Sequence, residues 1–172
     1  MDHLSDALDC FRCYKDLDIE DFLRTKAFAF LERGWCSVYL IVDEEAFDAG
    51  KIKVDAYFTL SHKSLIAEGL SKTKVKETSG FKESDSIHFV LIGQLGKYIA
   101  KLEDGTECRA DITSAEILDF AFEIIRASSA LIPCRCVLVE CSENPKVQKV
   151  YKDYHFSEFQ YDGEHYQLYK RL

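Results

Sequence analysis

One stretch decides the fold: Ile87-His88-Phe89-Val90-Leu91-Ile92-Gly93-Gln94-Leu95-Gly96-Lys97-Tyr98. Its first half is an apolar run with β-branched and aromatic residues, which predicts a central strand. Two glycines, Gly93 and Gly96, interrupt the second half, and a glycine inside a strand marks a bulge or a close approach to the backbone. The pattern predicts a strand whose first half is buried in the core and whose second half presents its backbone to a ligand.

The chain of 172 residues is predicted to form a single domain, 1–172, large enough to bury its own core. Its composition, 47% apolar and 30% charged, is that of a globular protein. No apolar run is long enough to span a membrane, so we expect no membrane contact. The acidic start at Met1–Asp6 lacks the basic and apolar regions of a signal peptide, which predicts a cytoplasmic protein.

Seven cysteines are scattered along the chain, and their odd number favours reduced, buried thiols over a disulfide framework. Cys10 and Cys13 form a C-x-x-C pair, which could be half of a zinc site. No second pair follows at a ligand spacing, so we predict no metal.

The net charge of −8 and the pI near 5.1 make the whole-molecule field repel polyanions. The segment 61–86 is the one basic local region and shows little apolar periodicity, so it is predicted to be a long loop. A solvated loop is the favoured interpretation of its lysines, and a flap that meets a phosphate-bearing substrate is the alternative.

Regular elements are predicted on both sides of the organising strand. Before it come an amphipathic helix over about 17–33, closed by Gly34, and an antiparallel pair of strands, 37–42 and 52–60. After it come a helix opened by a capping box at Thr113–Glu116 and ended by Pro133, a buried strand at 137–139, a helix from Asn144-Pro145, and a hairpin turning at Asp162-Gly163. This order predicts an α/β or α+β fold with a mixed sheet and helices on both faces.

The third helix carries a family resemblance. Its sequence Asn144-Pro145-Lys146-Val147-Gln148-Lys149-Val150-Tyr151, followed by Lys152-Asp153-Tyr154-His155-Phe156, resembles the Asn-x-x-Ala-x-x-x-Tyr-x-x-x-Gly-Phe helix of the GNAT family of acetyl-CoA-dependent N-acyltransferases. Val147 replaces the alanine and His155 the glycine. Leu91–Lys97 and Val137–Cys141 carry the likeness further, and 16–23, 39–42 and 56–61 are similar to the branch that includes tRNA-acetylating toxins.

The resemblance implies a GNAT-like, mostly antiparallel central sheet and an enzyme that uses acetyl-CoA (CoA) to acetylate an amine. Because the acidic surface disfavours RNA, we expect a small-molecule or protein amine rather than tRNA. A toxin that acetylates aminoacyl-tRNA and a catalytically degenerate acyl-CoA-binding module are the alternatives. The oligomeric state is left open between a monomer and a homodimer.

The resemblance also assigns roles to residues. Leu95, Gly96 and Lys97 would offer backbone N–H groups to the thioester carbonyl and pair with the pantetheine like an added strand. Tyr151 would protonate the departing CoA thiolate, since a phenol is protonated at neutral pH. Asn144 would contact the cofactor, although an N-cap before Pro145 explains it as well.

The pyrophosphate loop departs from the family. Where Arg/Gln-x-x-Gly-x-Gly/Ala is expected, this chain has Asp111-Ile112 and then, at the start of the helix, Thr113, Ser114, Ala115 and Glu116. Amides at a helix N-terminus can still hold a diphosphate, but the capping box competes for them and the acids repel phosphate. We expect weaker binding, helped by Arg109 or Lys149.

The general base is left open by the sequence. Glu140, at the end of the strand beside the organising strand, is the leading candidate. His62, Glu68 and His88 are other candidates, and a water chain without a dedicated base is an equal alternative.

Overall fold

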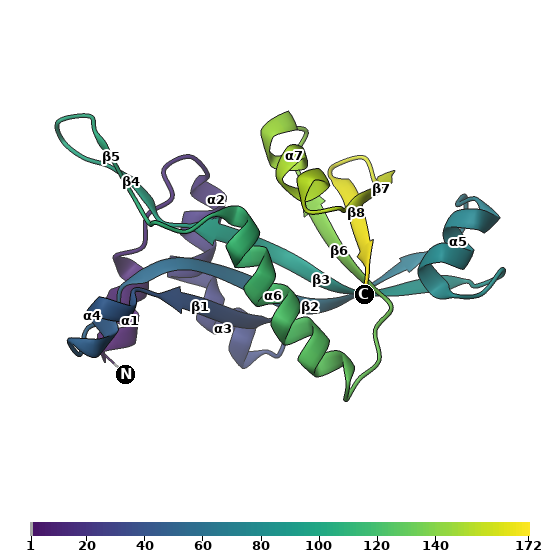
Figure 1. Cartoon of the computed structure of the whole chain (residues 1–172), viewed down its shortest axis with the longest axis horizontal. Coiled ribbons are helices and arrows are strands. Elements are labelled where there is room, and N and C mark those ends of the chain that lie inside the picture. Colours follow the sequence, from purple (N-terminus) through teal and green to yellow (C-terminus); the bar gives the residue numbers. More distant parts are fainter. Residues whose placement is uncertain (1) are drawn as a thin grey trace. The chain divides into compact units, whose positions relative to one another are not determined.

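The computed structural model describes residues 2–172, with side chains from Leu4 onward. The helices are α1 (Asp2–Asp9), α2 (Leu17–Asp21), the π-helix η1 (Phe22–Lys26), α3 (Ala27–Glu32), α4 (Glu44–Asp48), α5 (Lys72–Ser79), α6 (Ser114–Ser129) and α7 (Pro145–Asp153) (Figure 1). The strands are β1 (Ser37–Val42), β2 (Val54–Ile66), β3 (Ser86–Lys97), β4 (Ile99–Lys101), β5 (Glu107–Arg109), β6 (Cys136–Cys141), β7 (Ser157–Tyr161) and β8 (Tyr166–Arg171).

Six strands form a mostly antiparallel sheet in the order β1-β2-β3-β6-β8-β7, and β4 and β5 form a separate hairpin. β3 and β6 are parallel, whereas β6 with β8 and β7 with β8 are antiparallel. The predicted mixed α/β fold is therefore confirmed. The organising stretch is β3, the third strand of this order, as expected from its apolar run.

The chain divides into two compact units, which we describe separately. The first unit comprises 1–59 and 94–118, and the second comprises 60–93 and 119–172. The single domain predicted from chain length is neither confirmed nor excluded by this division. No helix in the described part of the chain is long and apolar enough to cross a membrane.

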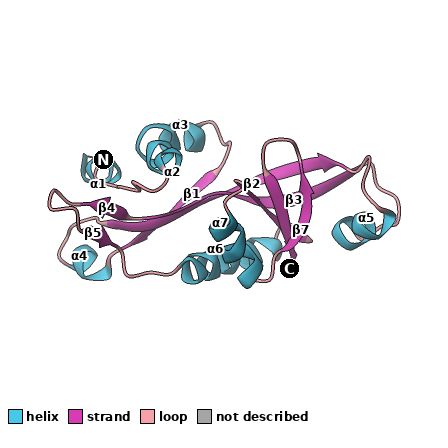
Figure 2. Cartoon of the chain, turned by 90° about the horizontal axis from the view of Figure 1, so that it is seen from above, coloured by secondary structure: helices cyan, strands magenta, loops and turns pink. Residues whose placement is uncertain are grey.

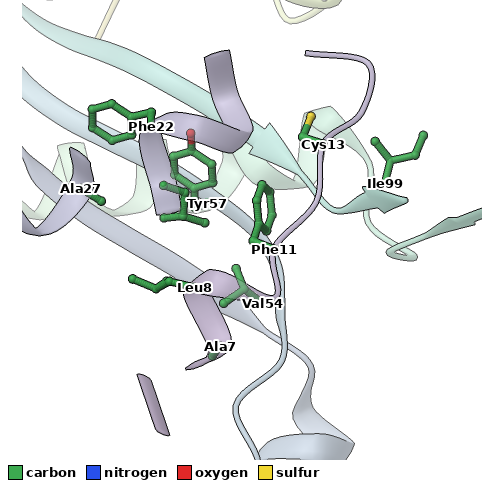
Figure 3. Close-up of a cluster of buried hydrophobic side chains, with 10 residues drawn as sticks. Ala7, Leu8, Phe11, Cys13, Phe22, Ala27, Val54, Tyr57 and Ile99 are labelled. Atoms are coloured by element: carbon green, nitrogen blue, oxygen red, sulfur yellow. The ribbon is translucent and has the colours of Figure 1, made fainter. Parts of the chain in front are cut away.

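The core of the first unit combines aliphatic side chains with three aromatic rings. Phe11, Phe22 and Tyr57 are buried together, and the rings of Phe11 and Tyr57 meet edge to face with centroids 5.5 Å apart (Figure 3). The Tyr57 hydroxyl donates to the Ile19 carbonyl at 2.7 Å, so the one polar atom of this ring is satisfied inside the core. In this unit α1, α2 and α3 lie on one side of the strands (Figure 2).

The helix predicted over 17–33 is present but has three parts. Asp16 caps it by accepting from the Ile19 amide, and Gly34 follows its end with a left-handed φ of 68°. Between α2 and α3 lies the π-helical turn η1, where the Ala27 amide donates to the Phe22 carbonyl. Apolar periodicity predicted the bounds but not this turn.

The prediction of a loop over 61–86 is wrong. β2 continues to Ile66, and α5 is capped by Ser71 and closed by Gly80 at a φ of 89°. Val75 and Thr78 are the buried residues of α5, and the Thr78 hydroxyl donates to the Lys74 carbonyl at 2.7 Å. Two buried positions are too few to produce a visible apolar period, which is why the sequence concealed this helix.

The remaining elements follow the sequence with local differences. The expected link between β1 and β2 contains α4, capped by Asp43, and the polar stretch after β3 forms the β4–β5 hairpin. α6 ends at Ser129, before Pro133, and the final hairpin turns at Asp162-Gly163 as predicted.

The cysteines are all free in the described structure, but they are not all buried. Cys13, Cys136 and Cys141 are buried, while Cys10 and Cys108 are exposed. Burial raises the pKa of Cys136 to about 11, so this thiol stays protonated. Among the described residues, no cluster of three or more His, Cys, Asp or Glu side chains could hold a metal ion.

Candidate functional site

The pairing of β3 with β6 stops at the first glycine of the organising stretch. Its last aligned pair is Ile92 with Val139. The next pair in register would be Gly93 with Glu140, and in the described structure these two residues are not partnered. Gly93 is exposed, so the strand presents bare backbone where its parallel ladder ends.

Gly96 is closely packed, and its predicted cofactor contact stays a prediction. It is buried, and a Cβ at this position would lie 2.4 Å from Cγ2 of Ile19 and 2.7 Å from Cε1 of Tyr57. These distances are shorter than any real carbon contact. Gly96 therefore permits close packing of β3 against α2 and β2, and both Gly96 and its half-buried neighbour Leu95 stay predicted cofactor contacts.

Lys97, the last residue of β3, connects the strand to the start of α6. Its ammonium Nζ donates to the Ile112 carbonyl at 2.8 Å. The cation also lowers the pKa of the Glu116 carboxyl, behind the larger effect of hydrogen bonds from Thr113. Lys97 therefore places a positive charge beside the helix N-terminus that was expected to hold the cofactor diphosphate.

The capping box at the start of α6 is formed in full. The Glu116 amide donates to Oγ1 of Thr113 at 3.2 Å, and the Thr113 amide and hydroxyl both donate to Oε2 of Glu116 at 2.7 Å. Ser114 and Ala115 occupy the first two helical positions, whose amides have no partner within a helix. These two amides, with Lys97, are the groups that fit a diphosphate, and the Glu116 carboxylate is the group that opposes it.

Glu140 is the centre of a partly buried polar network. Nζ of Lys63 donates to both of its carboxylate oxygens at 2.6 and 2.7 Å, and Nε2 of Gln167 donates to Oε1 at 2.6 Å. Gln167 is 2% exposed. The role of Glu140 as general base stays a prediction, and to accept a proton it would have to give up its pairing with Lys63.

The other base candidates are exposed. His62 and Glu68 lie on the surface, and His88 lies between two hydroxyls, with Nδ1 2.7 Å from Oγ of Ser64 and Nε2 3.3 Å from Oγ of Ser86. None of the three belongs to the Glu140 network.

Asn144 and Lys149 both have local partners on α7. The Asn144 side chain accepts from the Lys146 amide at 3.0 Å, so it is the N-cap, and Pro145 occupies the first turn. Lys149 pairs with Asp153 one turn later at 2.6 Å on the exposed face of the helix. Their cofactor contacts stay predictions, because these local pairs already explain both residues.

The end of α7 positions Tyr151. The Phe156 amide donates to the Tyr151 carbonyl at 3.0 Å, and the His155 amide donates to the Lys152 carbonyl at 2.9 Å. These two bonds form a Schellman motif, and the Phe156 ring packs edge-on against the Tyr151 ring with centroids 5.6 Å apart. His155, at the position where the resembled motif has glycine, is left-handed with a φ of 66°. The backbone of that motif is thus kept although the glycine is not.

Tyr151 is suited to donate a proton. The residue is 8% exposed, and burial raises the pKa of its hydroxyl well above the ordinary value of 10, with a smaller contribution from Cys141. The phenol therefore stays protonated at neutral and mildly alkaline pH. A general acid for a thiolate leaving group needs this property.

Comparison with known proteins identifies the fold. Neither a family model nor a curated relative matches the sequence. Among solved structures, AtaT complexed with acetyl-methionyl-tRNAfMet is 20% identical over 95% of this chain and 86% of that chain, with a TM-score of 0.71. A tyrosine-to-phenylalanine mutant of KacT is 15% identical over 99% of this chain and 91% of that chain, with a TM-score of 0.74.

The chain has the fold of these two structures, the GNAT fold. A third similar structure is a tyrosine-to-phenylalanine mutant of AtaT bound to acetyl-CoA and to the C-terminus of the antitoxin AtaR. It is 17% identical over 97% of this chain and 88% of that chain, with a TM-score of 0.69. The fold resemblance inferred from the α7 sequence is confirmed.

Within this GNAT fold, the predicted site residues divide between the two units. Leu95, Gly96 and Lys97 and the start of α6 belong to the first unit, where Lys97 and Ile112 are in direct contact. Glu140, Asn144, Lys149 and Tyr151 belong to the second. Sequence reasoning missed Lys63 and Gln167 as partners of Glu140. The sequence offered one signal for such a partner, a glutamine inside the alternating strand β8, because a buried side-chain amide requires a hydrogen-bond partner.

Proposed function

We propose that the protein is an acetyl-CoA-dependent N-acetyltransferase whose acceptor is the α-amine of an aminoacyl-tRNA. The observation that carries this proposal is the likeness, over 95% of the chain, to AtaT in complex with acetyl-methionyl-tRNAfMet. Composition favoured a small-molecule or protein amine, but the similar structures favour the tRNA alternative. An induced copy of such an enzyme would arrest growth, and a cognate antitoxin would relieve the arrest.

The distribution of charge removes the main objection to an RNA substrate. The first unit contains 18 acidic and 10 basic residues, whereas the second contains 12 of each. The whole net charge of −8 therefore belongs to the first unit, and the second is neutral overall. Exposed lysines of the second unit on α5, such as Lys72 and Lys76, are suited to meet phosphates without long-range repulsion from their own unit.

The chemistry needs one new bond and one broken bond. The lone pair of the acceptor amine attacks the thioester carbonyl carbon, the new C–N amide bond forms, and the C–S bond breaks with its electron pair leaving on sulfur. The Tyr151 hydroxyl gives its proton to that thiolate and regains one from solvent. The amine loses its extra proton to water or to Glu140.

The cofactor would be held by groups of the first unit. The free amides of Ser114 and Ala115 and the ammonium of Lys97 fit the diphosphate, and acetyl-CoA would supply the activated acetyl group. The Glu116 carboxylate opposes this binding, so the affinity should be lower than that of a glycine-rich loop.

Acetylation of purified acceptors tests the proposal. With labelled acetyl-CoA, we expect label in the RNA fraction when charged tRNA is supplied, none with uncharged tRNA, and release of N-acetyl amino acid after mild alkaline hydrolysis. Transfer to polyamines or peptides but not to charged tRNA would overturn the RNA acceptor and return the small-amine alternative.

Tyr151→Phe tests the proton donor. Because the variant keeps the ring and its packing on Phe156, we expect turnover to fall by roughly 10²-fold or more with unchanged acetyl-CoA affinity. Tyr161→Phe, on an exposed residue of β7, is the matched control. Equal turnover of Tyr151→Phe and wild type would remove this phenol from the mechanism.

A degenerate acyl-CoA-binding module is the second candidate, because the Glu116 carboxylate lies at the expected diphosphate site. Calorimetry with acetyl-CoA separates the two. Binding without transfer to any amine would support the module, and absence of both heat and thermal stabilisation would exclude both candidates.

A further inference from the structure

The first unit contains an apolar groove that the proposed reaction does not use. It lies between α1, the η1–α3 segment and β1. Its lining is entirely apolar: Leu4, Leu8, Leu23, Ala27, Phe28, Leu31, Val38 and Leu40. Leu8 and Ala27 also belong to the buried core of the unit, so the floor of the groove is fixed by the fold (Figure 3).

The rim of the groove is uncovered. Phe28 and Leu31, on α3, are 46% and 48% exposed although both line the groove. The volume of the groove is about 90 Å³. A dry engineered cavity of about 150 Å³ binds benzene, so this groove has room for a single aliphatic side chain.

The π-turn η1 gives the groove its shape. Leu23 lies within η1 and Ala27 follows it, and both line the groove. A π-turn adds a residue to the helical turn, so the side chains after it point to a different face than an α-helix would give. Such turns are rare and occur frequently at functional sites. Here the turn brings Ala27, a small residue, to the floor and Phe28 and Leu31 to the rim.

Charge decides which partner fits. The unit that holds the groove carries the whole net charge of −8. The basic side chains of η1 are already paired, Arg24 with Glu20 at 3.0 Å and Lys26 with Asp21 at 2.5 Å. The elements that border the groove carry exposed acids, Asp6 and Asp9 on α1 and Glu32 on α3. A second copy of this chain would bring two such sets of carboxylates together, which is unfavourable, whereas a basic partner would be attracted.

We infer that this groove is a docking site for a basic amphipathic segment of a partner protein. One Leu- or Ile-sized side chain of that segment enters the groove between Leu8, Ala27 and Leu31. Lysine or arginine side chains on its other positions face the acidic surface of the unit. This inference does not depend on the acetyltransferase activity, since none of the groove residues belongs to the proposed catalytic or cofactor site.

Titration of the full chain with a labelled probe peptide tests the inference. The probe is a helical peptide with leucines at three- and four-residue spacing and lysines elsewhere, and its counterpart has glutamates in place of the lysines. We expect the lysine peptide to bind, the glutamate peptide not to bind, and Leu31→Gln to weaken binding at least tenfold. Ala27→Leu, which fills the groove from inside, should weaken it as well.

The matched control is Phe120→Gln, which removes an equally exposed apolar side chain (47%) from α6 in the second unit. This variant should bind the lysine peptide like wild type. Equal losses in Leu31→Gln and Phe120→Gln, equal binding of the two peptides, or no binding at all would overturn the inference. So would a wild-type dimer in sedimentation that Leu31→Gln converts to monomer, because the occupant would then be a second copy.

Discussion

A single missing methyl group at Gly96 lets three elements approach one another. The residue is one of two glycines that made the β3 sequence conspicuous, yet its environment is a packed one between Ile19 and Tyr57. The sequence could not distinguish the two purposes of a strand glycine, because Ile19 and Tyr57 are remote along the chain. Gly93, where the ladder with β6 ends, is the glycine with exposed backbone.

We therefore predict that Gly96→Ala lowers the free energy of unfolding by about 1–3 kcal/mol, because the added Cβ forces Ile19 and Tyr57 apart. Urea unfolding measures the change. Gly105→Asn is the comparison, since Gly105 has open space around it and a left-handed φ of 85° that asparagine tolerates. Unchanged stability of Gly96→Ala would mean that the packing is loose at this point.

His155 carries a backbone cost that glycine would remove. We predict that His155→Gly raises the free energy of unfolding by up to about 1 kcal/mol, because a left-handed residue with a Cβ is disfavoured. His155→Val should lower it, since β-branched residues are least tolerant of a positive φ. Thermal unfolding of the three proteins gives the order, and a His155→Gly variant less stable than wild type would point to an unrecognised side-chain contact.

At the scale of elements, the sequence predicted the features that contacts between neighbouring residues determine, such as the starts of helices. The capping box of α6 and the Asn-Pro start of α7 were found because their partners lie within four residues. α5 and the π-turn η1 were missed because they depend on distant contacts, such as the Lys74 ammonium bonding the Phe159 carbonyl of β7 at 2.5 Å. The same limit applies to the site, where Tyr151 could be named but the partners of Glu140 could not.

At the start of α6, the Glu116 carboxylate stabilises the helix through the capping box but repels the diphosphate of the cofactor. We predict that Glu116→Gln tightens acetyl-CoA binding severalfold in calorimetry, because a neutral amide can keep the capping box without repelling a diphosphate. Thr25→Ser, elsewhere on the surface of the same unit, should change nothing. Equal affinities of Glu116→Gln and wild type would place the diphosphate away from this helix end.

The same substitution has a pH signature. Hydrogen bonds from Thr113 lower the pKa of the Glu116 carboxyl below its ordinary value of 4.5. A lowered pKa stabilises the fold above the unfolded-state pKa, and this contribution disappears as the pH falls through the folded-state value. The stability difference between wild type and Glu116→Gln should therefore be present near neutral pH and vanish in acid. A difference that persists below the lowered pKa would exclude the carboxylate as its source.

At the scale of the whole molecule, the net negative charge is concentrated in the first unit and is not distributed evenly over both units. Net charge computed over the entire sequence argued against RNA, although all of the excess acid belongs to the first unit. We predict that Lys72→Glu combined with Lys76→Glu raises the KM for aminoacyl-tRNA severalfold, with a reduced salt dependence, because phosphate contacts are lost. Lys51→Glu combined with Lys101→Glu, on two exposed residues of the first unit, is the charge-matched control. An equal KM change in both would assign the effect to net charge alone.

The Schellman motif at the end of α7 sets a fixed dimension. Each residue turns an α-helix by about 100°, so one residue inserted between the Asn144 cap and Tyr151 would swing the phenol to another side of the helix while Phe156 still closed its end. The number of residues between the Asn144 cap and the Phe156 ring thus fixes the side of the helix on which the proton donor lies. A homologue with a different count would have to find its acid elsewhere.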